Sequence, residues 1–307
     1  MEKEKKNKLK KFLTILFYIL MIVFIIKYLW GIDFSLIMGV KITWWVIFIS
    51  FIIRMIGLLI SPSSWEALLK RYHGKQLPKA KLYAIYAESW MGRYIPGKIG
   101  WIGGKILFAT NEGVATDTAV ITSFLDSILQ VFSSMLVAVI FFLFSGGLLQ
   151  INNQIVILMY VATCLVIICL LPPVFNRLVA FCYRILKNKK YTSDYWMNGR
   201  TLLKSTLIVS IAKLFSGTAV SVIAVSVMGP LSLNNFVYII AVNLVSTAIG
   251  MVALFAPAGL GIKESLQIVM LSAVLNKEMA VVIVTMASIQ SIIGDLVFFI
   301  GTRFLKK

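Results

Sequence analysis

The sequence predicts an all-α polytopic membrane protein, and its composition and hydropathy carry that prediction. The 307 residues are 60% hydrophobic and 14% charged, and the mean hydropathy is +0.92. These values exclude an ordinary soluble domain of this length. The longest polar connection, Asn176–Leu203, is too short to fold on its own. We therefore expect a single transmembrane domain over residues 1–307, with approximate halves 1–150 and 151–307 and no soluble domain.

About six apolar windows have the length of some 20 residues that a full transmembrane helix needs. They are Phe12–Gly31, Ile42–Ile60, Val120–Ser145, Gln154–Pro172, Ser205–Met228 and Met279–Thr302. Two further apolar zones, Leu82–Ala109 and Phe236–Leu275, contain clusters of Pro and Gly. Because Pro and Gly interrupt helices, we expect each zone to be a broken, re-entrant hairpin that leaves the membrane on the side it entered.

The segment SSWEALLKRYHGKQLP, which precedes the first interrupted zone, predicts a short helix on the membrane surface. Ser63 and Glu66 have the spacing of a capping box. Trp65, Leu68 and Tyr72 recur on one helical face. We expect that face to lie against the membrane.

Basic residues accumulate on one side of the predicted topology. Six lysines lie in the first eleven residues, five cations follow the second span, seven lie in or beside the middle connection, and three end the chain. The opposite connections carry only Lys41 and Lys277. Because cytoplasmic loops are rich in Lys and Arg, we expect both termini in the cytoplasm and the chain in the cytoplasmic membrane. Anionic headgroups account for the net charge of +18, so no nucleic-acid partner is expected.

The two interrupted zones resemble each other and enter the membrane from opposite sides in this topology. Each contains a Pro-x-x-x-Gly motif followed by a lysine, and the next span carries one buried acid. These residues are Pro96, Gly100, Lys105 and Asp126 in the first half, and Pro257, Gly261, Lys263 and Asp295 in the second. Such features indicate an inverted repeat, in which transporters place a binding site near the middle of the membrane.

A broken helix inside the membrane offers a binding site for an anion. Its backbone must be buried in protein or line a wet cavity, and the new helix start presents unpaired N–H groups with a partial positive charge. By the predicted boundaries, embedded cations exceed embedded acids by seven to four, which favours an anionic substrate. The residues expected to bind it are Arg93, Pro96, Gly97, Lys98, Lys105, Pro257, Gly259, Gly261, Lys263 and Glu264.

Four further embedded charges are expected to act in coupling or charge pairing: Arg54, Glu88, Asp126 and Asp295. Each of the three acids in this set either pairs with a buried cation or carries a coupling proton. The same two alternatives apply to Glu264. Arg54 either pairs with an acid as structural support or belongs to the site. Lys213 either lines the site or extends toward the cytoplasmic membrane surface.

Several other kinds of site have no support in the sequence. The single histidine, His73, lies in a basic segment, so a His-based metal site or triad is not expected. The three cysteines, Cys164, Cys169 and Cys182, imply no disulfide framework. No P-loop of the form G-x-x-x-x-G-K-[ST] occurs, so ATP is not expected to drive the protein. We expect no catalytic residues, no metal and no cofactor.

The stretch GRYIPGKIGWIGGKILFATNEGV, with FLDSI further along, resembles the flippase-like integral membrane proteins related to the transmembrane domain of lysylphosphatidylglycerol synthase. In that family a Pro-Gly-[Lys/Arg] motif precedes a basic residue and a later helix carries an acid. Here these are Pro96, Gly97, Lys98, Lys105 and Asp126. A second family motif, Pro-x-Gly-x-Gly-x-x-Glu, is similar to Pro257, Gly259, Gly261 and Glu264. The resemblance covers nearly the whole chain.

The resemblance implies movement of a lipid between the two leaflets. The best-known members move aminoacylated phosphatidylglycerol and carry a soluble synthase domain, which we do not expect here. Asp126 stands where Glu is common and Gly100 where an aromatic or polar residue is common, so a phospholipid and a polyprenyl-phosphate-linked sugar are both open as substrates. We expect a flippase that moves an anionic or phosphate-containing headgroup without ATP, with membrane lipids as its partners.

Two other functions stay open at this point. A membrane-embedded lipid-modifying enzyme would need a nucleophile or base beside a metal or cofactor site, and the scattered acids argue against it. A non-transporting component of a glycan- or lipid-assembly complex would tolerate neutralisation of Arg93, Lys98 and Lys105. The direction of transport, the coupling ion and the oligomeric state, whether a homo-oligomer or a complex with assembly enzymes, are also open.

Overall fold

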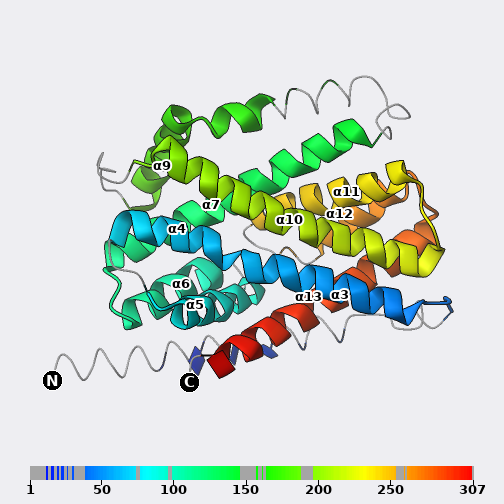
Figure 1. Cartoon of the computed structure of the whole chain (residues 1–307), viewed down its shortest axis with the longest axis horizontal. Coiled ribbons are helices and arrows are strands. Elements are labelled where there is room, and N and C mark those ends of the chain that lie inside the picture. The colour runs from blue at the N-terminus through cyan, green and yellow to red at the C-terminus, as the bar shows by residue number, and fades with distance from the viewer. Residues whose placement is uncertain are drawn as a thin grey trace.

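The computed structural model describes residues 39–73, 77–95, 99–145, 164–187, 196–253, 259 and 261–305, with isolated positions between 12 and 30 and at 157 and 161. These residues form helices and their connections, with no strand among them (Figure 1). Five of the described segments are long and apolar enough to cross a membrane: Trp44–Tyr72, Thr116–Phe144, Gly199–Met228, Leu233–Val252 and Lys277–Phe304. The predicted all-α multi-pass membrane fold is confirmed.

Four long helices match predicted spans. They are α3 (Trp44–Ile60), α7 (Thr116–Phe144), α10 (Gly199–Met228) and α13 (Lys277–Leu305). All four end within three residues of the predicted limit, and all but α10, which begins six residues early, start within four. Small and polar side chains occupy many of their buried positions, which lets helices approach closely inside a membrane. The predicted spans Phe12–Gly31 and Gln154–Pro172 lie largely outside the described residues.

The first interrupted zone folds as a pair of short helices. α5 (Lys79–Met91) ends in a 3-10 turn, η1 (Gly92–Tyr94), and α6 (Ile99–Asn111) packs back against α5. Each arm has 13 residues and is therefore about 20 Å long, shorter than the hydrocarbon core of about 30 Å. Gly100 permits this return, because a Cβ there would collide with the Gly92 carbonyl oxygen.

The second interrupted zone is less symmetrical than the sequence predicts. Its first arm, α11 (Leu233–Val252), has 20 residues, about 30 Å, and is long enough to cross the membrane by itself. Its second arm, α12 (Ile262–Leu271), has 10 residues and reaches only half that length. The difference follows from the sequence, because the cluster of glycines from Gly250 to Gly261 comes late in the zone.

α4 (Pro62–His73) corrects one expectation. It follows α3 directly, with only Ser61 between the two helices. Its side chains Trp65 and Leu68 are fully buried. Its apolar face packs against α7 and α10 rather than against the membrane surface. The remaining described helix, α9 (Pro172–Lys187), lies at the edge of the bundle (Figure 1).

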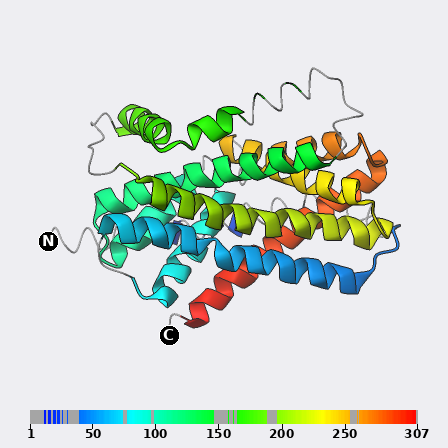
Figure 2. The same cartoon turned by 45° about the horizontal axis from the view of Figure 1, so that its top comes forward.

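The elements pack in matching pairs. α3 runs alongside α10 (Figures 1 and 2), α7 packs against α11, and α13 packs against α5. The short second arm of each hairpin packs against the long helix that follows it, α6 against α7 and α12 against α13. Figure 1 shows α5 and α6 toward one end of the long helices and α11 and α12 toward the other.

Two of the apolar clusters of the core border the polar centre of the bundle. One cluster joins α10, α11, α12 and α13 around residues such as Ile223, Ile239 and Ile283. A second joins α4, α5 and α6 around residues such as Trp65 and Ile85. Polar side chains therefore gather between the two clusters, in the middle of the long helices.

Candidate functional site

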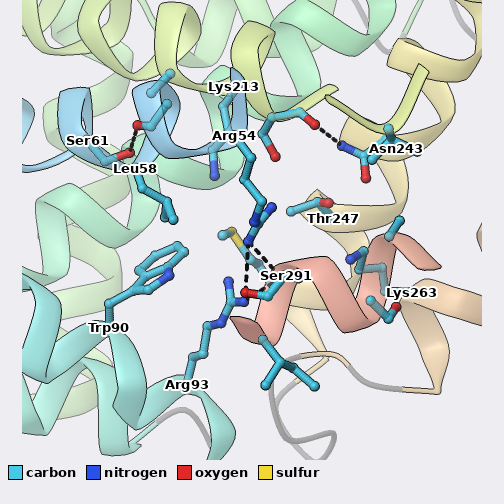
Figure 3. A pocket seen from close by; sticks show the side chains of 18 of the residues that line it. Arg54, Leu58, Ser61, Trp90, Arg93, Lys213, Asn243, Thr247, Lys263 and Ser291 are labelled. Carbon is cyan, nitrogen blue, oxygen red and sulfur yellow. Dashed lines mark hydrogen bonds between the residues drawn. The ribbon is translucent and has the colours of Figure 1, made fainter. Parts of the chain in front are cut away.

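A cavity opens between the two apolar clusters, where α3, α10, α11, α12, α13 and the first hairpin meet (Figure 3). Groups the size of water can occupy about 90 Å³ of it. At roughly 10–15 Å³ for each water, this is room for several water molecules or a compact anion. Its wall carries four basic side chains, Arg54, Arg93, Lys213 and Lys263.

Arg54 and Arg93 reach the cavity from opposite sides and meet beside Ser291 of α13 (Figure 3). Arg54 Nη2 donates to Ser291 Oγ at 2.7 Å and to Asp295 Oδ1 at 3.3 Å. Arg93 Nη2 donates to Ser291 Oγ at 2.9 Å and forms an ion pair with Asp295. Ser291 and Asp295 are four residues apart, so one face of α13 presents both acceptors.

Asp295 is fully buried and accepts from four side chains. Besides the two arginines, Trp90 Nε1 donates to Oδ1 at 3.2 Å and the Tyr94 hydroxyl donates to Oδ2 at 2.7 Å. A carboxylate has about four lone-pair sites, and those of Asp295 accept from these four side chains. Asp295 is therefore a fixed counter-charge that holds both arginines in place.

Lys213 and Lys263 lack the carboxylate partner that the arginines have. Lys213 lies in the middle of α10 and is only 7% exposed, with its ammonium 5.9 Å from the centre of the Trp90 ring. Lys263 lies in the first turn of α12 and lines the same cavity. Within the described part of the chain, neither ammonium forms an ion pair with an acid. Because an unpaired cation inside a membrane protein is costly, the buried Lys213 and the half-buried Lys263 are the groups that a bound anion would neutralise.

Glu264 is engaged in holding the start of α12. Its Oε2 accepts from the Gly261 backbone N–H at 2.7 Å, and its Oε1 accepts from the Ser288 hydroxyl at 2.9 Å. One of the N–H groups that a helix start offers to an anion is thereby occupied. A bound anion would depend on the basic side chains more than on the helix end.

The charge balance of the cavity favours an anion. Four basic side chains face two acids, Asp295 and Glu264, so two positive charges are in excess. A phosphate group carries between about −1 and −2 charges and several strong acceptor oxygens, which suits this surplus. Within the described residues, no group of three His, Cys, Asp or Glu side chains is placed to hold a metal ion.

Lys105 and Asp126 form a separate ion pair behind the cavity wall. Lys105 Nζ lies 2.6 Å from Asp126 Oδ2, and both side chains are fully buried. The ammonium faces three aromatic rings, with centres 4.5 Å away at Tyr86, 5.3 Å at Trp101 and 5.4 Å at Trp65. Of these five residues only Trp101 lines the cavity. Lys105 therefore does not line the cavity, unlike the predicted binding residues Arg93, Lys263 and Glu264.

The remaining predicted residues are distributed as follows. Glu88 is buried on α5 and lies 3.6 Å from Arg303 Nε, away from the cavity wall. Gly259 and Gly261 have φ values of +73° and +86° in the turn before α12, a region that favours glycine. Pro96, Gly97, Lys98 and Pro257 lie outside the described residues.

Lys213 is the cavity-lining residue whose position the sequence leaves open. The helix α10 begins at Gly199 and ends at Met228, which places Lys213 about 20 Å from either end. A lysine side chain cannot reach the membrane surface over that distance, so its charge must be accommodated inside the protein. The sequence predicts that this helix begins at Ser205, six residues late, which places Lys213 too close to the cytoplasmic membrane surface.

A family model described as the lysylphosphatidylglycerol synthase TM region matches residues 11–298. The chain belongs to this family. The match includes both hairpins and all four cations of the cavity. No curated protein matches the chain. Membership of the lysylphosphatidylglycerol synthase transmembrane family confirms the resemblance on which the sequence expectations rest and is consistent with a function connected with membrane lipids.

Proposed function

We propose that this protein is a lipid flippase that moves an anionic or phosphate-containing headgroup between the two leaflets without ATP. The observation that carries the proposal is the surplus of positive charge in the cavity, where Lys213 and Lys263 lack a protein counter-ion among the described residues. Phospholipids and polyprenyl-phosphate-linked sugars share the phosphate that this surplus favours. Membership of the family supports a lipid as the substrate.

The packing of the helices supports an inverted repeat. One half consists of α3, the first hairpin and α7, and the other of α10, the second hairpin and α13. Exchanging the halves maps the contact of α7 with α11 onto that of α13 with α5, and maps α3 with α10 onto itself. It also maps α6 with α7 onto α12 with α13. Transporters with such a two-fold relation place their site between the repeats and alternate its access.

The distribution of charge supports a defined orientation in the membrane. Basic residues cluster in the first eleven residues, between α4 and α5, before α10 and at the end of the chain, and under the positive-inside rule these segments and both termini would lie in the cytoplasm. The first hairpin would then enter from the cytoplasmic side of the plasma membrane. The second would enter from the outside, as re-entrant arms of the two repeats.

The cavity would act by replacing the hydration shell of the headgroup. Phosphate in hydrocarbon is costly, because charges lose their solvation there. Lys213 and Lys263 would compensate that charge. Asp295 would keep Arg54 and Arg93 in fixed positions through its ion pairs with them. The lipid tail would stay in the bilayer. The energy would come from a lipid gradient, the membrane potential or protons.

The proposal is tested by leaflet exchange in reconstituted vesicles. The purified protein is incorporated into liposomes that contain a trace of fluorescent phosphatidylglycerol, fluorescent phosphatidylcholine or a fluorescent polyprenyl phosphate. A membrane-impermeant quencher then reports the fraction of label in the outer leaflet over time. We expect faster exchange of at least one phosphate lipid with net negative charge than in protein-free vesicles. Equal rates with and without protein for all three lipids would contradict the proposal.

The same preparation separates the alternative functions. A lipid-modifying enzyme would convert a labelled lipid to a new product, and a non-transporting component of an assembly complex would neither convert nor move it. We propose that the protein is not an enzyme, because the acids of the cavity are occupied in holding basic side chains and the start of α12. Chromatography of the recovered lipids measures conversion directly.

A further inference from the structure

The Lys105–Asp126 pair has features that a purely structural ion pair does not need. It joins the short arm α6 to the long helix α7, and neither charge is exposed. The ammonium is enclosed by Tyr86, Trp101 and Trp65, so Asp126 supplies its counter-charge. Anything that removes the charge of Asp126 leaves a buried cation in need of another anion.

Asp126 differs from Asp295 and Glu264 in how its oxygens are used. Both oxygens of Asp295 and both of Glu264 accept hydrogen bonds from protein donors. Asp126 Oδ2 meets Lys105, but Oδ1 is buried and has no hydrogen-bond partner among the described residues. A protonated carboxyl needs a free oxygen to carry its hydrogen, and Asp126 has one.

The groups around Asp126 leave Lys105 as its nearest opposing charge. Gln130, one turn along α7, donates to the Tyr86 hydroxyl at 3.2 Å. On α10, the charge of Lys213 interacts with that of Asp126. On α4 the charges of Glu66 and Lys70 pair with each other. On α11 the one titratable side chain, Tyr238, donates to the Met270 carbonyl oxygen.

A thin aromatic wall separates the pair from the anion-binding cavity. Trp101 lines the cavity and also lies 5.3 Å from Lys105 Nζ. Ser61, another lining residue, has a side-chain interaction with Tyr86, whose ring lies 4.5 Å from the same ammonium. The Lys105 ammonium thus contacts both the carboxylate of Asp126 and a residue of the cavity wall.

We propose that Asp126 is the proton-coupling carboxylate of the transport cycle, and that it shares Lys105 with the anionic headgroup. Resting on the proposed flippase function, the step is an exchange of counter-ions. When the phosphate approaches through the cavity, Asp126 takes up one proton at Oδ1 and becomes a neutral carboxyl. Its ion pair with Lys105 is lost, and the ammonium, still protonated, is neutralised by the phosphate. Release of the headgroup reverses both events.

This exchange links lipid binding to pH with a defined sign. Proton uptake accompanies binding, so affinity for the headgroup rises as pH falls and weakens as pH rises. One coupled proton changes the affinity by at most about tenfold for each pH unit. A neutral residue at position 126 removes the link, because Lys105 then has no competing carboxylate at any pH.

The direct test measures protons and binding together in the purified protein. Short-chain phosphatidylglycerol, a polyprenyl phosphate, inorganic phosphate and zwitterionic phosphatidylcholine are each added to lightly buffered protein that contains a pH dye. We expect uptake of up to about one proton for each bound anionic lipid, none with phosphatidylcholine, and a new carboxylic-acid C=O band in the infrared difference spectrum. A response to inorganic phosphate alone would show that the site takes a free anion, and would overturn the assignment to lipid transport.

Matched variants on α7 assign the proton. Asp126→Asn should abolish the proton uptake and flatten the pH dependence of binding, whereas Asp117→Asn, at an exposed position of the same helix, should change neither. If Asp126→Asn does not fold, Asp126→Glu decides the matter, because it keeps the proton uptake but shifts the infrared band. A band unmoved by Asp126→Glu would overturn the proposal.

Failure of this inference differs from failure of the flippase function. If the wild-type protein exchanges anionic lipids between leaflets but binds them without proton uptake, the flippase function stands and the role of Asp126 is wrong. If lipid binding takes up a proton that depends on Asp126 while leaflet exchange is no faster than in protein-free vesicles, the coupled binding site stands and the flippase function is wrong.

Discussion

Buried positive charge is accommodated in two ways within one cavity. Arg54 and Arg93 are held by Asp295 and Ser291, so their charge is compensated before any ligand arrives. Lys213 and Lys263 form no ion pair with a described acid. Under the proposed function, the arginines shape the cavity and the lysines attract the anionic headgroup.

Replacing Lys213 should weaken binding of an anionic lipid. A hydrogen bond to a charged group contributes about 1.5–3 kcal/mol, so Lys213→Ala should raise the dissociation constant for short-chain phosphatidylglycerol about 10- to 100-fold. The matched control is Lys204→Ala, at an exposed position of the same helix, which should leave binding unchanged. Calorimetric titration of the two variants measures the difference, and equal affinities would remove Lys213 from the site.

Replacing Asp295 should destabilise the fold as well as the site. Asp295→Ala leaves Arg54 and Arg93 buried without their carboxylate, and breaking a buried ion pair costs about 3–5 kcal/mol. Thermal unfolding in detergent should show a marked fall in midpoint. The fall should be much smaller in Asp117→Ala, because that side chain is exposed. Similar midpoints for both variants would show that Asp295 is not the central counter-charge.

At the scale of elements, the turns of the two hairpins determine where the cavity lies. The first hairpin closes through Gly92 and Gly100, and the second through Gly250 and Gly259. A Cβ at Gly259 would lie 2.7 Å from the Gly250 carbonyl oxygen. These close contacts let α12 return beside α11 and bring Lys263 to the cavity wall.

Gly259→Ala should disturb this second turn. Its φ of +73° costs a non-glycine residue about 1–3 kcal/mol, and the contact with Gly250 adds to that cost. The matched control is Gly301→Ala in α13, where a Cβ meets nothing within 4 Å and helix propensity favours Ala by up to about 1 kcal/mol. We expect a lower unfolding temperature for the first variant and an equal or higher one for the second.

At the scale of the whole molecule, hydropathy predicts the long helices well, because each is a continuous apolar run. α7 and α13 begin within four residues of their predicted starts, and both interrupted zones are broken near their Pro and Gly clusters. The sequence also predicts the short arms α5, α6 and α12. It does not predict that α11 is long enough to cross the membrane.

The partners of the buried charges could not be predicted in the same way. Arg54 and Asp295 are separated by 241 positions, and their contact depends on how α3, α5 and α13 pack. The sequence places Lys105 next to a helix break. Only the packing of α6 against α7 shows that Lys105 forms an ion pair with Asp126 and lies beside the ring of Trp101. Trp65 has the spacing of a surface helix, yet it is fully buried and its helix packs against α7 and α10. Local patterns determine helices, whereas contacts between distant helices determine the site.

The proposed inverted repeat predicts which ends of the molecule face each compartment. In a protein with its three cysteines replaced by serine, Asn111→Cys marks the end of the first hairpin and Asn234→Cys the start of the second, both at exposed positions. A membrane-impermeant thiol reagent added outside whole cells should label only Asn234→Cys, and both after permeabilisation. Labelling of both variants in intact cells would contradict opposite entry of the hairpins.

The central claim is tested most directly by lipid exchange in vesicles that contain wild-type protein, Lys213→Ala or Lys204→Ala. The fluorescent lipid is phosphatidylglycerol in one set and a polyprenyl phosphate in the other, and the measured quantity is the rate at which outer-leaflet label is replenished. We predict that the wild type and Lys204→Ala accelerate exchange of at least one of the two lipids, and that Lys213→Ala falls toward the protein-free rate. Exchange of both lipids at the protein-free rate with wild-type protein, or undiminished exchange with Lys213→Ala, would contradict transport through this cavity.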